Sequence, residues 1–238
     1  MSRTAAAIFV FILTVTFAVS PFLADEFGGF DPEQFPVPQV DPPVQPAGYA
    51  FAIWGIIYLW LLVGMGFGLW ARRAEATWHP MRLPLIVSLG VGTAWLSVAL
   101  VSPVWASVLI WVMLISALIA LFRSPREDNW FAALPLGLYA GWLSAASCVS
   151  LGLLAAGYGY MDASTAALAA VFLALVIASA VQSQLARTPT YGIAVIWALV
   201  AVVVHNLGSN STVAALAAGG ALALLMPTFK AWRADQSG

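Results

Sequence analysis

Eight stretches of mostly apolar residues without charge follow one another along the chain. About 20 such residues in an α-helix cross the hydrocarbon core of a bilayer. We therefore predict an all-α fold, a polytopic transmembrane helix bundle of about eight spans in a single membrane domain, 1–238. The composition agrees, because 62% of residues are hydrophobic and 8% are charged, whereas soluble domains carry about a quarter charged residues. The spans are expected at residues 5–23, 49–70, 83–102, 104–122, 130–156, 164–185, 191–207 and 212–229.

The basic residues are sorted between the connections in a way that orients the bundle. All nine lie near the two termini or after the second, fourth and sixth spans: Arg3, Arg72, Arg73, Arg82, Arg123, Arg126, Arg187, Lys230 and Arg233. The positive-inside rule assigns this side to the cytoplasm, so both termini are predicted to be cytoplasmic. Seven spans are the alternative, with a kink at Pro103 or a merger across 207–210, but either change would move later basic residues to the opposite side.

The first span has two interpretations. Arg3, an apolar run and Phe22-Leu23-Ala24 before Asp25 fit a cleaved signal peptide. A proline at position 21 and the length of the apolar run favour a retained helix instead. The orientation of the remaining spans is the same in both cases.

Several function classes lack the residues that they need. No run of basic residues is present, so nucleic acid is not an expected partner. The single cysteine, Cys148, provides neither a disulfide nor a metal cluster. No carboxylate or basic side chain lies well inside a span, which disfavours ion-coupled transport. No catalytic motif occurs either, so we predict a protein that is not an enzyme and requires no cofactor or metal.

The connection at 24–48 differs from the other loops. It carries five acidic residues, six prolines and no basic residue, so it cannot remain helical and is expected to run as extended chain. Three phenylalanines, Phe27, Phe30 and Phe35, could dock it onto the bundle. We interpret it as an external acidic lid; a solvated linker is the alternative.

An aromatic stripe follows this loop. Phe51, Trp54 and Tyr58 are spaced by three and four residues, which places them on one face of a helix. Such a face packs against neighbouring helices in most membrane proteins, but it also suits a large, flat hydrophobic ligand.

The block from Pro42 to Tyr58, with Trp54 and Tyr58 four apart, resembles the tryptophan-rich sensory protein (TspO/MBR) family, which includes the mitochondrial translocator protein. Two further stretches, 135–146 and 191–200, are similar to longer bacterial relatives. The resemblance covers 49–156, and the spans in 164–229 are additional to the five of familiar members. It implies binding of a porphyrin or other tetrapyrrole, or of a sterol-like lipid. Carried over by position, it implies ligand-binding roles for Pro43, Pro46, Tyr49, Phe51, Trp54 and Tyr58.

We add five residues to this candidate site from the aromatic and polar side chains within the spans: Trp95, Tyr139, Trp142, His205 and Asn206. His205 is also the only buried acid or base that an enzyme could use. The predicted function is an integral membrane receptor or carrier for a hydrophobic planar ligand. An ion-uncoupled transporter of a small hydrophobic metabolite and a structural subunit of a complex are the alternatives.

The expected partners are membrane lipid and a hydrophobic small-molecule ligand. A bound tetrapyrrole or lipid is the expected ligand. Small residues at close-packing spacing, such as Gly64 and Gly68, predict helix contacts that could form a homodimer or join a larger complex. The predicted location is the bacterial inner membrane, crossed several times.

Overall fold

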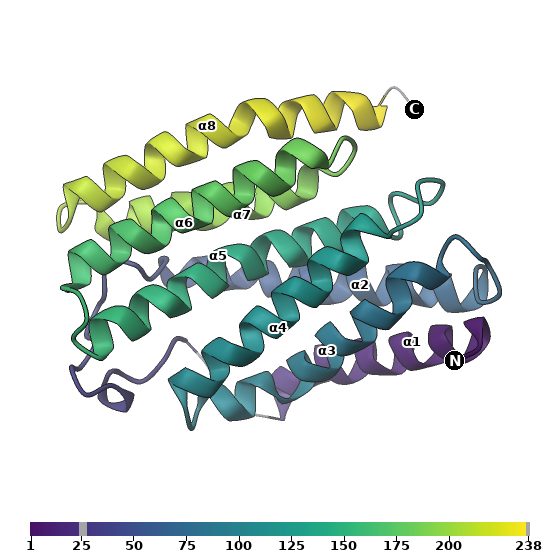
Figure 1. The fold of residues 1–238 in the computed structure, drawn as a ribbon, viewed down its shortest axis with the longest axis horizontal. Coiled ribbons are helices and arrows are strands. Elements are labelled where there is room, and N and C mark those ends of the chain that lie inside the picture. The colour runs from purple at the N-terminus through teal and green to yellow at the C-terminus, as the bar shows by residue number, and fades with distance from the viewer. Residues whose placement is uncertain (24–27, 237–238) are drawn as a thin grey trace.

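The computed structural model describes residues 1–23 and 28–236, and the ordered elements in these ranges are helices. Eight of them are long and apolar enough to cross a membrane, which confirms the predicted helical bundle (Figure 1). Three short 3₁₀ turns accompany them, at Ser20–Phe22, Pro32–Gln34 and Gly48–Ala52. The α-helices are α1 (Arg3–Val19), α2 (Ile53–Trp70), α3 (His79–Ala99), α4 (Pro103–Phe122), α5 (Ala133–Gly157), α6 (Ala163–Gln184), α7 (Pro189–Asn206) and α8 (Ser211–Gln236).

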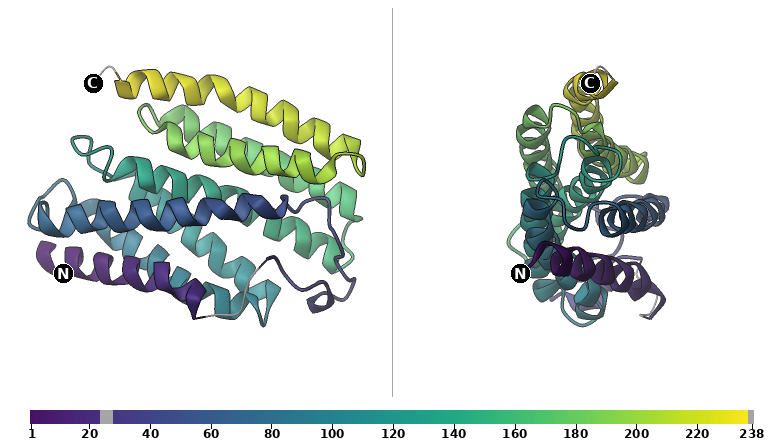
Figure 2. Two further views of the ribbon diagram at one scale, coloured as in Figure 1. Left: turned by 180° about the vertical axis from the view of Figure 1, so that it is seen from behind. Right: turned by 90° about the vertical axis from the view of Figure 1, so that its right-hand side faces the viewer.

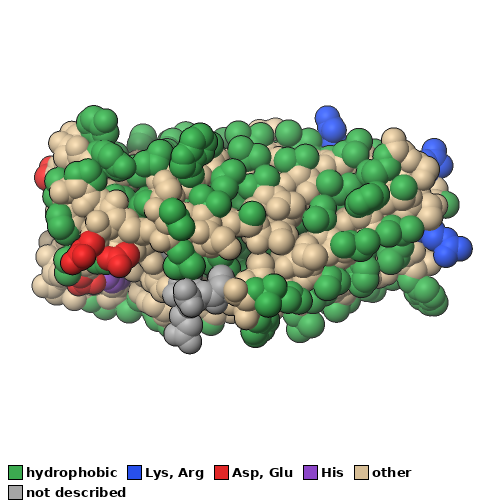
Figure 3. Space-filling view, turned by 90° about the horizontal axis from the view of Figure 1, so that it is seen from below, with side chains coloured by type: hydrophobic (Ala, Val, Ile, Leu, Met, Phe, Trp, Pro, Cys, Tyr) green, Lys and Arg blue, Asp and Glu red, His purple; other side chains and the backbone are tan. Residues whose placement is uncertain are grey.

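The two ends of the bundle differ in charge. Both termini lie at one end, together with the α2–α3, α4–α5 and α6–α7 connections (Figure 1). On the face in Figure 3, Lys and Arg side chains lie at that end and acidic side chains at the other, with an apolar surface between them. The basic end also carries Glu75, Glu127, Asp128 and Asp235, whereas every Lys and Arg of the chain lies at or near that end. This separation matches the alternation of basic connections predicted from the sequence, and the basic end is the one that the positive-inside rule assigns to the cytoplasm.

The two shortest connections are true helix breaks. Ser102 has extended backbone angles, and its hydroxyl accepts a hydrogen bond from the Trp105 N–H at 3.4 Å, so it caps α4. At the second break, Gly208 has φ +84°, a value that favours glycine. Asn210 then accepts from the Val213 N–H at 3.2 Å at the start of α8. The chain therefore reverses at both places, and the seven-span alternative is wrong.

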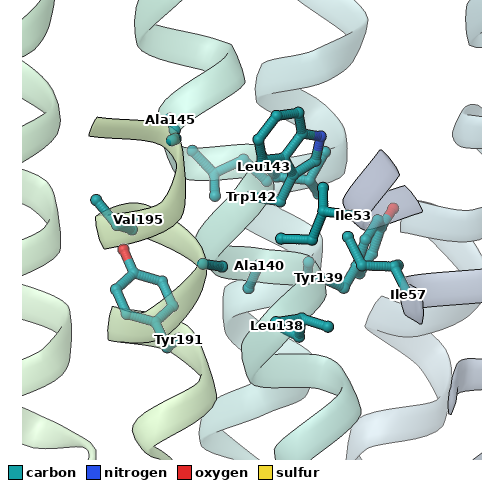
Figure 4. Packing of buried hydrophobic residues seen from close by; sticks show 14 of the residues in the cluster. Ile53, Ile57, Leu138, Tyr139, Ala140, Trp142, Leu143, Ala145, Tyr191 and Val195 are labelled. Atoms are coloured by element: carbon teal, nitrogen blue, oxygen red, sulfur yellow. The ribbon is translucent and has the colours of Figure 1, made fainter. Parts of the chain in front are cut away.

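α5 lies at the centre of the bundle and contacts α2, α4, α6 and α7. Figure 2 shows α2 from behind, where it lies beside α1, and the 3₁₀ turn Gly48–Ala52 that precedes α2 contacts α7. In Figure 4, Tyr139 and Trp142 of α5 lie toward Ile53 and Ile57 of α2, whereas Tyr191 lies on the opposite side of α5. α5 therefore separates two groups of helices and contributes side chains to both.

Small residues bring the helices close together. A side chain on Gly141 would collide with the Tyr191 carbonyl of α7. Gly64 is pressed in the same way against the Phe131 carbonyl, and Gly68 against the Trp78 ring. The Gly64 and Gly68 face is thus occupied within this chain, while the predicted homodimer or complex stays a prediction.

The described part of the acidic loop, 28–47, is bound to the bundle along its length. Its backbone N–H groups donate to two helices, from Val37 to the Gly157 carbonyl at 2.8 Å and from Ala47 to the Ala201 carbonyl at 3.1 Å. The Phe35 ring is buried and packs on Gly157. This loop is therefore a docked segment over the acidic end. Its residues Asp25, Glu26 and Phe27, and the predicted cleavage site after Ala24, lie outside the described residues.

Arg82 lies in the first turn of α3 instead of a solvated connection, and its side chain is 1% exposed. Its guanidinium donates to four backbone carbonyls, those of Arg3, Gly68, Arg72 and Arg73, at 2.7–3.3 Å. A planar guanidinium carries five donors in a fixed fork, so one side chain can tie these segments together. Arg82 thus joins the N-terminus, the end of α2 and the start of α3.

Candidate functional site: an aromatic cavity among the first five helices

A cavity of about 230 Å³ lies among α1 to α5. Each of the five helices contributes to its wall, and α2 contributes through both its first turns and the 3₁₀ turn that precedes it. The lining is mostly aromatic and apolar, with hydroxyl groups from Ser20 and Tyr58 and indole N–H groups from its tryptophans. The wall residues are Phe17, Ser20, Pro21, Phe51, Trp54, Tyr58, Gly92, Trp95, Leu96, Ile110, Met113, Trp142, Leu143 and Ala146.

The aromatic rings around this cavity are fixed by contacts with one another. Trp54 and Tyr58 stack, with ring centroids 5.3 Å apart and planes inclined by 17°. Trp142 meets Trp54 edge-on at 6.3 Å and Phe51 at 5.9 Å. Phe17 of α1 meets the rings of Trp54 and Tyr58 edge-on at 5.9 and 5.1 Å. Such contacts hold the rings in defined orientations before any ligand is present.

Three polar groups in this wall have no protein partner. Within 1–23 and 28–236, no hydrogen-bond acceptor is found for the indole N–H of Trp54 or of Trp142, and no partner is found for the Tyr58 hydroxyl. Buried polar groups are hydrogen-bonded in the great majority of cases, whereas these three atoms are not fully buried and belong to residues that line the cavity. These groups are therefore available to a ligand.

The Tyr139 hydroxyl differs from these three groups. It bonds to Ser88 at 2.9 Å, and Ser88 donates to the Met113 carbonyl at 2.8 Å. The Tyr139 ring is fully buried beside Trp54, with centroids 6.3 Å apart. Tyr139 thus supports the aromatic wall without lining the cavity.

A smaller apolar pocket of about 90 Å³ adjoins the cavity. Phe51, Trp95 and Trp142 line both hollows and form the partition between them. The acidic loop covers this pocket through Phe30, Val44, Gln45 and Pro46, and α5, α6 and α7 provide most of the remaining wall. No residue from 28–47 lines the larger cavity. The described part of the loop therefore covers the smaller pocket.

The structure divides the predicted site residues into two groups. Phe51, Trp54, Tyr58, Trp95 and Trp142 are brought together around the cavity, with Tyr139 behind them and Pro46 in the adjoining pocket. The other four residues, Pro43, Tyr49, His205 and Asn206, line neither hollow.

Those four hold the loop and the entry to α2 in place. The Asn206 amide donates to the Pro43 carbonyl at 2.8 Å. The Nε2 atom of His205 lies 3.4 Å from a carboxylate oxygen of Asp41, a residue with φ of 50°. Tyr49 packs edge-on against Trp197, with centroids 5.4 Å apart. Their contacts within the chain are structural, and their predicted ligand-binding role stays a prediction.

Sequence reasoning missed Phe17. It is one of several apolar residues in a uniformly apolar span, and neither spacing nor composition distinguishes it from its neighbours. The one available signal is Gly92 on α3, because a Cβ atom there would lie 2.7 Å from the Phe17 ring. A glycine in a spanning helix indicates a close approach, but it does not indicate which side chain approaches.

No group of three or more His, Cys, Asp or Glu side chains that could hold a metal ion occurs in the described part of the chain. The cavity wall contains none of these residue types. The groups that it offers are aromatic faces and neutral hydrogen-bonding atoms, which suit a ligand that is largely apolar.

The sequence of this chain matches one family model, described as TSPO-like protein, over residues 4–229. The match reaches into all eight helices, and so extends beyond residues 49–156, which the resemblance covers. No curated protein and no solved structure matches the chain.

Proposed function

Because the chain belongs to the TSPO-like family, we propose that it is a membrane receptor for a hydrophobic, planar ligand bound in the aromatic cavity. Membership of the family indicates a membrane-bound protein of ligand binding or transport. The proposal adds the kind of ligand, a tetrapyrrole or a sterol-like lipid. It also adds the place where the ligand binds, the face formed by Trp54, Tyr58 and Trp142.

The observation that carries the proposal is the set of three unpartnered polar groups on aromatic side chains. A flat apolar molecule can stack on the rings, and its polar substituents can take up the two indole N–H groups and the phenol. Leaving these groups without partners in an apolar site has a cost in free energy, and a ligand that bonds to them removes that cost.

The size of the cavity restricts how such a ligand fits. Pockets for ligands of this size usually have volumes of roughly 300–1,000 Å³, and this cavity has about 230 Å³. A tetrapyrrole therefore requires the partition formed by Phe51, Trp95 and Trp142 to move, so that the adjoining pocket joins the cavity. A smaller polycyclic molecule or part of a lipid fits without that movement.

A receptor is favoured over a carrier by the packing of the basic end. In α5, every residue from Ala133 to Ala145 is buried. Gly137 and Gly141 are pressed against Thr190 and Tyr191 of α7 and against Thr188, which precedes it. A carrier must open to both sides, and close packing at this end leaves little space for such an opening. The ion-uncoupled transporter remains the second candidate, and efflux from loaded proteoliposomes would distinguish it, because a receptor gives none.

Purification of the full chain with its native lipid, followed by mass spectrometry of the extracted small molecules, tests the proposal. We expect a polycyclic or tetrapyrrole compound with the wild-type protein and its loss in a Trp54→Ala/Trp142→Ala variant. Trp105→Ala is the matched control, because Trp105 is 64% exposed on α4 and outside the cavity. The same compounds in equal amounts from all three proteins would contradict the proposal.

We place the protein in the inner membrane of a bacterium, and membrane fractionation checks that location.

A further inference from the structure

A groove of about 380 Å³ lies between α1 and α3 on the surface of the bundle. Most of its residues are exposed and belong to helices that span the membrane, so the groove faces lipid. Four hydroxyl groups line it, and those of Thr16, Ser20 and Thr93 can donate to carbonyls of their own helices, which leaves their oxygens able to accept. The wall consists of Val15, Thr16, Val19, Ser20, Leu23, Thr93 and Ser97.

This groove and the aromatic cavity lie on opposite sides of the contact between α1 and α3, which we call the seam. Ser20 lines both hollows. On α1, Thr16 faces the groove and its neighbour Phe17 faces the cavity. On α3, Thr93 and Ser97 line the groove, and the residues that precede them, Gly92 and Leu96, line the cavity. The two hollows are therefore separated by the contact between two helices and by no further layer of structure.

The packing of α1 on α3 closes this seam. The Thr16 and Thr93 hydroxyl oxygens are 3.2 Å apart on the groove side. Each hydroxyl has a single hydrogen, which can go either to the other hydroxyl or to a carbonyl of its own helix. On the cavity side, the Phe17 ring fills the space that a side chain at Gly92 would occupy, and it contacts the rings of Trp54 and Tyr58. Phe17 is therefore the ring that stands between the groove and the cavity, and a path between them requires this ring to leave Gly92.

The acidic loop, by contrast, is fastened to the outer end of the bundle by hydrogen bonds. Gln34 donates to the Ala99 and Leu100 carbonyls at 3.2 and 2.8 Å. Together with the bonds from Val37, Ala47 and Asn206, these join the loop to α3, α5 and α7. Opening a path beneath the loop would break several of these bonds.

We propose that the ligand enters the aromatic cavity sideways from the outer leaflet, through the groove between α1 and α3, with Phe17 as the gate. The ligand is then a molecule dissolved in the membrane, mostly apolar, with a polar group that the hydroxyls of Ser20, Thr93 and Ser97 can bond during passage. This inference rests on the proposed function and adds to it the source and route of the ligand.

Cross-linking across the seam tests the route. In a Cys148→Ala background, Thr16→Cys/Thr93→Cys places two thiols at positions whose hydroxyls are 3.2 Å apart, a geometry compatible with a disulfide. Protoporphyrin is supplied in lipid vesicles, and its association with the reconstituted protein is followed by porphyrin absorbance. Oxidation is expected to slow association by roughly tenfold, and a reductant is expected to restore it.

Two comparisons complete the test. Ala47→Cys/Ala201→Cys ties the loop to α7 and should leave the association rate unchanged after oxidation. Thr93→Phe narrows the groove without oxidation and should also slow association, whereas Ile119→Phe, on the lipid-facing side of α4, should not. Unchanged rates in both the cross-linked seam and Thr93→Phe, or slowing by the loop tether alone, would overturn the route. Absence of saturable binding in the reduced parent would instead overturn the proposed function and, with it, this inference.

Discussion

The rings of Trp54 and Tyr58 stack with their centroids 5.3 Å apart, one helical turn from each other on α2. Residues four apart on a helix lie one above the other, so this pair follows from the sequence spacing alone. The third polar ring, Trp142, arrives from α5, far away in the chain, and meets Trp54 edge-on at 6.3 Å. The site is thus one local pair completed by a long-range contact.

Two tyrosines near this site should respond differently to loss of the hydroxyl. The Tyr58 hydroxyl has no partner among the described residues, so Tyr58→Phe is expected to weaken protoporphyrin binding several-fold, by about 1 kcal/mol, with little effect on stability. The Tyr139 hydroxyl bonds to Ser88, so Tyr139→Phe is expected to lower stability by about 1 kcal/mol and leave binding unchanged. Equilibrium titration and thermal melting in detergent separate the two effects. Equal losses of binding in both variants would contradict the assignment.

The fold could be predicted because it follows from local composition. A span needs only enough apolar residues in succession, and the basic residues mark alternate connections. Ser102 and Gly208 were the uncertain points, and there the structure shows a helix cap and a left-handed turn. These are local features that the residue types already favour.

The site could be predicted where aromatic side chains stand out in the sequence, and Trp95 and Trp142 were identifiable as aromatic residues within spans. Phe51, Trp54 and Tyr58 were identifiable from their spacing, whereas Phe17 enters through the packing of α1 on α3, which no periodicity records. Arg82 was assigned to a connection because the cost of burying a charge argues for solvent. Four carbonyls from three segments accept hydrogen bonds from the guanidinium and so offset that cost. These carbonyls come together only when the chain folds, so the sequence does not indicate them.

Arg82 should be important for stability. Arg82→Met removes the donors of four backbone carbonyls near the basic end, and we expect a loss of about 3 kcal/mol, seen as a lower melting temperature in detergent. Arg73→Ala is the control, since the Arg73 side chain is exposed and its carbonyl is retained. Similar melting temperatures for the two variants would show that the bonds of Arg82 contribute little.

Two glycines on α2 should differ in their tolerance of a methyl group. Gly64→Ala would place a Cβ atom against the Phe131 carbonyl, and backbone cannot easily move aside. Gly66 has only the Phe11 ring near it, at the ordinary contact distance of 3.5 Å. We expect Gly64→Ala to lower the melting temperature and Gly66→Ala to keep or raise it, since alanine favours the helix by about 1 kcal/mol.

Native mass spectrometry of both variants would also test the predicted homodimer, and a change of oligomeric state in Gly64→Ala without destabilisation would place that face between two copies.

Asp162 gives α6 a pH-dependent cap. Hydrogen bonds from the Thr165 side chain and from the backbone N–H groups of Ser164 and Thr165 lower the pKa of the Asp162 carboxyl in the folded protein. A carboxyl with a lowered folded pKa stabilises the fold above its ordinary pKa, about 3.9, and this contribution is lost as pH falls through the lowered value. Asp162→Asn retains a capping oxygen without the charge. The melting temperatures of wild type and Asp162→Asn should therefore converge on acidification below about pH 4; a constant difference from pH 6 downward would exclude the carboxylate as the cause.

Equilibrium titration of the reconstituted protein with protoporphyrin, followed by the absorbance of the porphyrin itself, tests the central claim most directly. The account predicts saturable binding to wild type and to Trp105→Ala, with the affinity reduced by roughly tenfold or more in Trp54→Ala and in Trp142→Ala, because each loses a stacking face and a free N–H donor. Equal affinity in all four proteins, or absorbance changes that never saturate, would contradict binding in this cavity.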